Sequence, residues 1–371
     1  MIQQKSTPKQ DGYYMPGEFE PHDGCIMIWP ERPGSWPFGA KAARVAFANI
    51  ARAISESETV YMLVNAQNRR SAEQMLPKSV KLLEIESDDA WARDVGPTFV
   101  KNREGKVRAV NWSFNAWGGD YDGLYRHFEK DDRVAKEFCK QLGVFCYDAA
   151  PFVLEGGSIH CDGEGTVIAT EACLLSPGRN PSLCREQIEE RLKEYLGAQK
   201  IIWLKHGILG DETNEHIDNI CAFSSPAELV LAFPDEESHP QYAYSRECLD
   251  TLLSSTDAKG RPFRIHKLPM PKYPVCIRKE ELSGMCFEEG EDIREEGEPL
   301  AASYVNFYIS NNGIILPQFE DPNDARAVQI LSEIFKGRKI YPIAARDIIV
   351  GGGNIHCITQ QIPKGGALCE I

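Results

Sequence analysis

A thiol near the end of the chain, Cys357, follows the three consecutive glycines Gly351–Gly353 and then Asn354-Ile355-His356. Glycines leave a short piece of backbone bare, so a ligand is able to approach it closely. A thiol held beside such a segment is suited to nucleophilic attack if a base and a site surround it. The alternative is an ordinary buried cysteine, one of twelve in the chain, that packs as a small hydrophobic side chain.

Two features indicate that the surroundings of this thiol are repeated along the chain. The pattern Gly-Gly-x-Ile-His occurs at 156–160 and again at 352–356. Asp94, Glu155 and His216 recur at equal spacing, each in a comparable position of its block. Repetition of this kind predicts one structural unit used several times. Taken singly, Asp94 and Glu155 could each be an ordinary carboxylate in a turn. A lone histidine is more often a hydrogen-bonded core residue or a surface residue than a functional one.

If the repeated units close into a ring, the polar positions converge at its centre, and we expect a site formed by Asp94, Glu155, His216, Asp218 and Cys357. Several carboxylates are costly to bury together unless a cation neutralises them, and a planar guanidinium with many N–H donors suits them well. A thiolate is able to attack the guanidinium carbon, while an imidazole protonates departing ammonia and then deprotonates water. His216 and Asp218 are two residues apart, so on a strand both side chains would leave the same face.

The walls of such a site are predicted from two tryptophans and one glycine. Trp91 and Trp117 are able to line a channel for an aliphatic chain and to stack on a cation, although core tryptophans look the same in sequence. Gly352 offers bare backbone for substrate binding. The glycine run is not a phosphate loop, because no Lys-Ser/Thr follows it. The histidines form neither His-x-x-x-His nor His-Glu-x-x-His, although His216, Asp218 and Cys357 in principle bind a metal.

Composition sets the protein class and its partners. The chain has 371 residues, a formal charge of -14 and a pI near 5.2, which oppose binding to nucleic acid or to an anionic membrane surface. The first residues lack the apolar core of a signal peptide, and no stretch approaches the ~20 apolar residues of a membrane span. The cysteines show no Cys-x-x-Cys spacing, which favours reduced thiols. We therefore expect a soluble, cytoplasmic protein.

Hydrophobic periodicity predicts alternating strands and helices throughout the chain. Gly197 should stop one helix, and Ser182 is its expected N-cap. The expected helices are 41–54, 71–75, 134–142, 188–196, 242–253 and 324–335, and the expected strands are 25–29, 59–64, 80–86, 98–101, 107–114, 144–147, 166–170, 201–204, 220–223, 229–233, 263–268, 304–309, 314–317 and 340–343.

These elements make about five αβ blocks, which favours a single closed α/β domain over 1–371 with a polar leader at 1–17 and an acidic, irregular loop at 279–298. An ordinary open sheet with a coincidental repeat is the alternative.

At these residues the chain resembles the agmatine deiminases, or agmatine iminohydrolases, of the guanidino-modifying (pentein) superfamily. The resemblance extends nearly end to end and is carried by 91–100, 115–119, 155–159, 210–213, 216–219, 302–308 and 352–361. It implies a fivefold pseudosymmetric α/β propeller of ββαβ-type blocks. It also implies hydrolysis of agmatine to N-carbamoylputrescine and ammonia through a covalent cysteine-amidino (thiouronium) intermediate, in the polyamine metabolism that leads from arginine to putrescine.

By that similarity Cys357 is the nucleophile, His216 the acid/base, Asp94 and Asp218 the guanidinium-binding carboxylates, and Glu155 a further orienting carboxylate. The resemblance implies no metal and no organic cofactor, and we expect a homo-oligomer, a dimer or a tetramer. One departure is Glu215, where the family usually has glycine; an added carboxylate would either raise the pKa of His216 or point to solvent.

Two other functions remain open at this point. One is a deiminase of free or peptidyl arginine, for which an α-carboxylate would need a basic partner such as Arg93. The other is a non-catalytic polyamine-binding protein.

Overall fold

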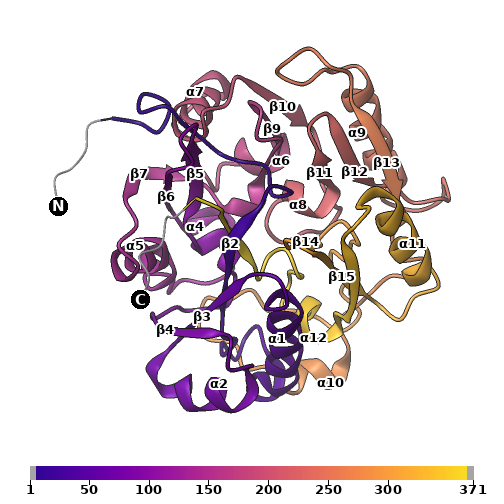
Figure 1. The fold of residues 1–371 in the computed structure, drawn as a ribbon. Coiled ribbons are helices and arrows are strands. Elements are labelled where there is room, and N and C mark those ends of the chain that lie inside the picture. Colours follow the sequence, from indigo (N-terminus) through magenta and orange to yellow (C-terminus); the bar gives the residue numbers. More distant parts are fainter. Residues whose placement is uncertain (1–5, 366–371) are drawn as a thin grey trace.

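Five small sheets surround a common centre in the computed structural model, which describes residues 6–365 (Figure 1). Each sheet holds an antiparallel pair of strands followed, after a helix, by a third strand parallel to the second. The fold is therefore the predicted fivefold pseudosymmetric α/β propeller of ββαβ blocks, and the open-sheet alternative is wrong.

Four blocks follow one another along the chain. They are β5 (Thr98–Asn102), β6 (Val107–Ser113), α5 (Asp131–Gln141) and β7 (Cys146–Val153); β8 (Ile159–Cys161), β9 (Thr166–Thr170), α7 (Arg185–Leu196) and β10 (Lys200–Leu204); β11 (Cys221–Ser225), β12 (Glu228–Ala232), α9 (Tyr242–Leu253) and β13 (Arg264–Leu268); and β14 (Tyr308–Ile309), β15 (Gly313–Gln318), α11 (Asp324–Ile334) and β16 (Lys339–Ala344).

The fifth block joins the two ends of the chain and closes the ring. It consists of β17 (Gln360–Pro363), β2 (His22–Ile28), α1 (Lys41–Ile54), β3 (Thr59–Val64) and β4 (Lys81–Glu84). The C-terminal β17 pairs antiparallel with the N-terminal β2, with Gln361 opposite Cys25. The residues just before β2 therefore lie beside those just after β17, and the Lys364 N–H donates to the Pro21 carbonyl at 2.8 Å.

Short elements fill the connections within and between the blocks. They are β1 (Tyr13–Tyr14), η1 (Pro37–Ala40), η2 (Ala66–Asn68), α2 (Arg69–Met75), α3 (Ala92–Val95), α4 (Gly119–Asp122), η3 (Gly156–Ser158), α6 (Glu171–Leu174), α8 (Ile217–Ile220), α10 (Lys279–Leu282) and α12 (Arg346–Ile349).

The longer helices lie on the outside of the ring and bury one face each (Figure 1). In α1, Phe47, Ile50 and Ile54 recur at helical spacing and are fully buried, as the sequence predicted. Gly197 ends α7 in the left-handed conformation with φ 66°, again as predicted. The N-cap of α7 is Cys184 and not Ser182, because the Cys184 N–H donates to the side chain of Gln187 at 2.9 Å.

Two regions without predicted structure pack onto the ring. In the described part of the leader, Tyr13 and Tyr14 form β1 and pair with β5. The acidic stretch 279–298 contains the short helix α10 and is otherwise irregular.

The strand expected at 304–309 is restricted to its last two residues, Tyr308 and Ile309, and the residues before it turn toward the centre.

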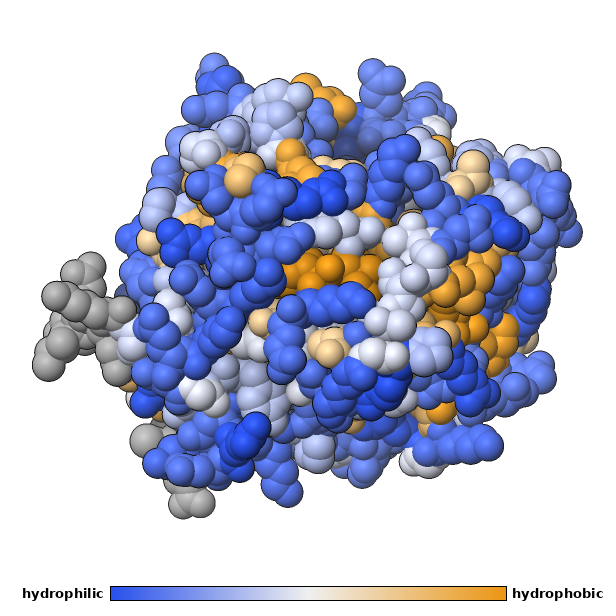
Figure 2. Space-filling view, turned by 90° about the horizontal axis from the view of Figure 1, so that it is seen from above, coloured by the Kyte–Doolittle hydropathy of each residue, from blue (hydrophilic) through white to orange (hydrophobic). Residues whose placement is uncertain are grey.

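Polar residues dominate the surface, as Figure 2 shows for one face, where hydrophobic residues appear only in a few separate areas. Among the described residues, no helix combines the length and the apolar character needed to cross a bilayer.

Candidate active site

The residues that precede the first strand of each block point to the centre of the ring. Asp94 lies in α3 before β5, Glu155 precedes β8, Asp218 lies in α8 before β11, and Cys357 precedes β17. The structure brings the five predicted residues together. His216 Nδ1 lies 4.0 Å from Asp94 Oδ1, His216 Nε2 lies 3.6 Å from Glu155 Oε2, and Cys357 Sγ lies 3.8 Å from Asp218 Oδ2.

The predicted strand geometry at 216–218 is wrong. His216 is the N-cap of α8, and Asp218 lies within that single helical turn. The turn reaches the site because Asn219, buried behind it, donates to Asp211 Oδ2 at 2.7 Å and accepts from Asn306 Nδ2 at 2.8 Å. The two copies of Gly-Gly-x-Ile-His also differ, because His160 lies on β8 whereas His356 precedes β17 in a turn.

Asp94 is held by two donors and leaves a negative charge facing the site. Trp117 Nε1 donates to its Oδ2 and the Gly157 N–H to its Oδ1, both at 2.9 Å. Burial raises the pKa of Asp94 to about 6, and the neighbouring Asp218 and Glu155 add to that rise against the opposing effect of His216. Asp94 is therefore a carboxylate whose negative charge is incompletely compensated.

The negative charge of Glu155 is neutralised by the buried Arg179. Its Oε1 lies 2.8 Å from Arg179 Nε, and both side chains are completely buried. Burial alone would raise its pKa, but Arg179 and His216 outweigh that effect and lower the pKa of Glu155 to about 2. Burial would lower the pKa of His216, yet Asp94, Cys173 and Glu155 raise it well above the ordinary value. The two carboxylates therefore favour the protonated form of His216, which lies between them.

Cys357 is a buried thiol in a negative environment. Burial, Asp218 and Asp94 raise the pKa of its thiol well above the ordinary value, while hydrogen bonds from the Asn354 backbone and the Asn306 side chain lower it. The Asn306 Nδ2 lies 3.2 Å from Cys357 Sγ. A cation bound between Asp94 and Asp218 would cancel the two charges that oppose thiolate formation.

Asn306 is a site residue that the sequence reasoning missed. It occupies, before β14, the place that Asp94, Glu155 and Cys357 occupy in their blocks. Its position in the repeated block could have identified it, but a strand was predicted over 304–309, and a residue inside a strand was not considered for the site.

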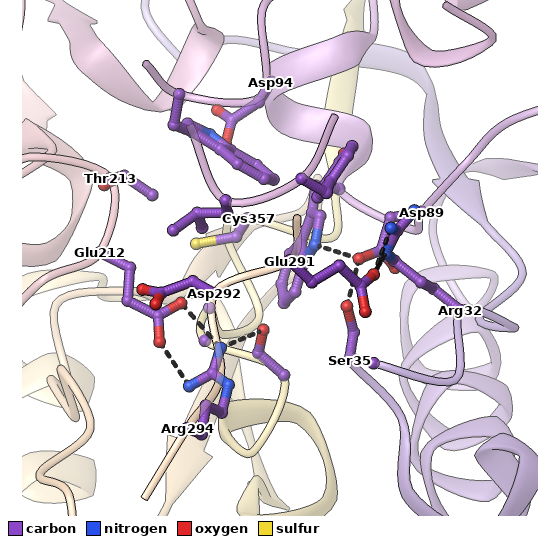
Figure 3. A pocket seen from close by; sticks show the side chains of 18 of the residues that line it. Arg32, Ser35, Asp89, Asp94, Glu212, Thr213, Glu291, Asp292, Arg294 and Cys357 are labelled. Atoms are coloured by element: carbon purple, nitrogen blue, oxygen red, sulfur yellow. Dashed lines mark hydrogen bonds and ion pairs between the residues drawn. The ribbon is translucent and has the colours of Figure 1, made fainter. Parts of the chain in front are cut away.

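A pocket leads to Cys357 (Figure 3). The predicted wall residues Trp91, Trp117 and Gly352 are among the residues that line it. Trp91 and Trp117 meet edge to face, with ring centroids 6.5 Å apart. The Trp91 Nε1 donates to Asp89 Oδ2 at 3.0 Å, so the ring is fixed. Gly352 has φ 110°, and an added Cβ there would lie 2.5 Å from Glu212 Oε2, so only glycine fits.

The mouth of the pocket carries two ion pairs that were not predicted as site residues. Arg294 makes a double contact with Glu212, at 2.5 and 2.7 Å, and also donates to the Gly351 carbonyl at 3.0 Å. Arg32 donates through Nε to Glu291 at 2.6 Å. Arg294 and Glu291 come from the acidic stretch 279–298, so that stretch, which was expected to be an exposed loop or insertion, lines the pocket that leads to the site.

Glu215 takes neither of the two expected arrangements. Its carboxylate accepts from the Gly207 N–H at 2.7 Å and lies 3.4 Å from His206 Nδ1, away from the site. Its φ of 65° lies in the left-handed region that favours glycine. The backbone conformation therefore explains why glycine suits this position, and the carboxylate leaves His216 undisturbed.

Two groups of side chains have donor atoms within 4.8 Å of one another: Glu155, Cys173 and His216, and Glu18, His160 and His356. In each group an arginine already supplies positive charge, since Arg179 pairs with Glu155 and Arg93 lies 3.4 Å from Glu18. The groups therefore fit a metal ion poorly, and the expected metal independence stays a prediction.

Comparisons with known proteins agree with this geometry. The profile of the Porphyromonas-type peptidyl-arginine deiminase family matches residues 14–363. A protein of Selenomonas ruminantium with the provisional name agmatine deiminase is 55% identical over 98% of this chain and 99% of its own length.

Solved structures extend the likeness to the fold. The agmatine deiminase of Enterococcus faecalis is 44% identical, covers 98% of this chain and 99% of its own, and superposes with a TM-score of 0.95. A substrate-bound agmatine deiminase of C. jejuni is 27% identical, covers 95% and 97%, and has a TM-score of 0.80. With its site residues gathered as described, the chain belongs to the agmatine deiminases within the Porphyromonas-type peptidyl-arginine deiminase family.

Proposed function

We propose that this protein hydrolyses agmatine to N-carbamoylputrescine and ammonia, with Cys357 as the nucleophile. The observation that carries the proposal is the position of the Cys357 thiol, 3.8 Å from Asp218, whose Oδ1 is buried without a hydrogen-bond partner among the described residues. The thiol also lies near Asp94, which is 4.0 Å from His216. Such a site is completed by a planar cation with several N–H donors, which a guanidinium is.

The guanidinium binds between Asp94 and Asp218. Asp218 Oδ1 is buried and has no hydrogen-bond partner among the described residues, so it is an acceptor left for a ligand. Arrival of the cation lowers the pKa of the Cys357 thiol, because it cancels the two charges that raise it. The thiol proton leaves to solvent, and the thiolate faces the guanidinium carbon.

The first chemical step forms the C–S bond and breaks a C–N bond. The thiolate attacks the guanidinium carbon, His216 gives its proton to the departing amino group, and ammonia leaves. The amidino group stays on sulfur as a thiouronium. Asp94 and Asp218 keep their contacts with its remaining N–H groups.

The second step reverses the roles of the same residues. The now neutral His216 takes a proton from water, the hydroxide adds to the carbon, and the C–S bond breaks with its electron pair returning to Cys357. The product is the ureido compound, and the surplus proton leaves with ammonia as ammonium. Glu155 and Arg179 hold the imidazole between the two faces of the site.

The mouth of the pocket favours agmatine over arginine. Both arginines among the pocket-lining residues, Arg32 and Arg294, are already paired with carboxylates. An α-carboxylate would add an anion near Glu212, Glu291 and Asp292, and burying an unpaired charge costs several kcal/mol, roughly tenfold in selectivity for each ~1.4 kcal/mol.

The test compares agmatine, free arginine and a blocked arginine peptide in one ammonia-release assay. We expect the catalytic efficiency for agmatine to exceed that for arginine by at least about a hundredfold. Equal rates would contradict the agmatine assignment and favour the arginine deiminases. Tight agmatine binding without ammonia release would favour the polyamine-binding alternative.

Three expectations accompany this proposal. The acidic charge and the lack of a membrane-spanning helix in residues 6–365 support a cytoplasmic enzyme, and the family resemblance supports a homo-oligomer and a role in putrescine formation. Light scattering on the purified chain distinguishes a dimer or tetramer from a monomer.

A further inference from the structure

The two histidines of the repeated Gly-Gly-x-Ile-His motif lie face to face beneath the site. The rings of His160 and His356 are 6.0 Å apart and nearly parallel, at 22°. Both are buried, at 5% and 3% exposed, and neither takes part in the chemistry described above. Their hydrogen bonds nevertheless differ completely.

Both ring nitrogens of His356 face a carboxylate. Its Nδ1 lies 2.7 Å from Asp218 Oδ2, and its Nε2 lies 2.8 Å from Glu18 Oε2. A carboxylate only accepts hydrogen bonds, so each nitrogen must carry a proton and the ring is an imidazolium. Burial and Arg93 lower the pKa of His356, but Glu18 and Asp218 outweigh them and raise it.

Glu18 is itself fixed on its far side. Its Oε1 accepts from the Ile309 N–H at 2.9 Å, and Arg93 Nη2 lies 3.4 Å from its Oε2. The charged and titratable groups around His356 are thus Glu18, Asp218, Arg93 and the stacked His160. Together they form a buried chain of alternating charge that ends at Asp218.

His160 makes a contrasting set of contacts. Its Nδ1 faces the Phe223 N–H at 3.4 Å, which requires an unprotonated nitrogen. Burial lowers its pKa to about 4, with His356 and Arg93 acting in the same direction against Glu18. The same motif therefore supplies one neutral and one charged imidazole, and only the charged one touches a residue of the site.

On the basis of the proposed function, we propose that His356 is a positioning residue for Asp218. Its Nδ1–H holds Asp218 Oδ2, so that Oδ1 is left to face the substrate guanidinium. Its positive charge also offsets the charge of Asp218, whose Oδ2 lies 3.8 Å from Cys357 Sγ.

Two substitutions separate these contributions. His356→Gln extends toward Glu18 and loses the bond to Asp218, so we expect KM for agmatine to rise at least about tenfold with a smaller change in kcat. His356→Asn keeps an amide donor near the Nδ1 position but removes the charge. For this variant we expect a KM within about threefold of the unsubstituted protein.

The effect of the positive charge of His356 on the Cys357 thiol is measured without any substrate. The alkylation rate of Cys357 by iodoacetamide is followed between about pH 7 and 10 through the mass of the peptide that contains Cys357. In His356→Asn we expect the thiol to react about tenfold more slowly at each pH in this range, because loss of the positive ring raises the pKa of the thiol further. His160→Asn, which replaces the stacked neutral ring and keeps an acceptor, should leave both KM and the alkylation profile unchanged.

If the His356 variants do not fold, Glu18→Gln takes their place. It leaves the Asp218 bond intact and removes the partner that keeps His356 charged, so a smaller decrease of the alkylation rate is expected. Unchanged KM and alkylation in folded His356 variants, or an unchanged profile in Glu18→Gln, would overturn the proposal. Because alkylation needs no agmatine, a failure of the proposed function would appear separately, as absent ammonia release with the slower alkylation retained.

Discussion

The floor and the rim of the pocket treat charge in opposite ways. At the rim, Arg32 pairs with Glu291 and Arg294 pairs with Glu212, so each charge has its partner before a ligand arrives. The floor is lined by Asp94 and Cys357, and Glu155, His216 and Asp218 are buried around them. There the pKa of Asp94 is raised to about 6, and Asp218 Oδ1 has no hydrogen-bond partner among the described residues. The floor is completed only by a bound cation, whereas the rim is complete without one.

Replacing the thiol at the floor should have the largest effect. Cys357→Ser removes the thiol that is proposed to form the covalent intermediate, so we expect ammonia release from agmatine to fall to background. The melting temperature should stay close to that of the unsubstituted protein, since serine is similar in size. Ammonia release that stays near normal in this variant would remove the covalent mechanism.

A methyl group added to the floor should be nearly as damaging. In Gly157→Ala the new Cβ would lie 2.6 Å from His216 Nδ1, 2.9 Å from Asp94 Oδ1 and 3.0 Å from Asp218 Oδ2. These side chains are buried and bonded, so they must move away from the positions that hold the guanidinium. We expect kcat/KM to fall by roughly a hundredfold or more.

Gly260→Ala is the matched control. An added Cβ at Gly260 meets nothing within 4 Å, although its φ of 81° is strained for alanine. It should lower stability by about 1 kcal/mol and leave kcat/KM unchanged. Equal losses of activity in both glycine variants would mean that Gly157→Ala lowers activity by destabilising the protein and not by displacing the side chains at the floor of the pocket.

Acid should weaken the floor before it affects the fold. Because the pKa of Asp94 is raised to about 6, its carboxylate is protonated as the pH falls through that value, and kcat/KM should drop about tenfold per pH unit below it. A carboxyl whose pKa is raised on folding adds stability as it is protonated, and Glu155, with a pKa of about 2, stays ionised there. A pH profile of kcat/KM beside melting temperatures between about pH 5 and 8 checks this. A flat profile contradicts the role of Asp94.

Changes at the rim should be mild. Arg294→Met removes the double contact with Glu212, a partly exposed pair, so we expect KM for agmatine to rise by a few-fold to about tenfold with kcat retained. Arg294→Lys keeps the positive charge but loses the planar guanidinium. Its KM for agmatine should lie between that of the unsubstituted protein and that of Arg294→Met. A loss of kcat as large as that of a floor variant would break the distinction between floor and rim.

The sequence predicted the floor well because the floor is periodic. Asp94, Glu155, His216 and Cys357 were found from repeated spacing and motifs, and the helices were found from their apolar periodicity, as in α1. Periodicity fails where one block departs from the others. Asn306 was missed because its apolar neighbours Val305 and Phe307 read as a continuous strand.

The remaining site residues depend on contacts between distant segments. Glu18 contacts His356 where the two ends of the chain meet and close the ring, and no local pattern in the sequence encodes that contact. Arg294 reaches Glu212 from an acidic stretch whose composition is typical of a solvated loop. His216 and Asp218 were expected to leave the same face of a strand, and both lie beside Gly157 but on a helical turn, because a single turn is too short to show a period.

The covalent intermediate on Cys357 tests the account most directly. The protein is mixed with agmatine, quenched in acid within the first turnovers, digested and analysed by mass spectrometry. The account predicts that the peptide containing Cys357 gains the mass of agmatine less ammonia, and that the gain disappears in Cys357→Ser. Ammonia release without any such adduct, or an adduct on another cysteine, would contradict it.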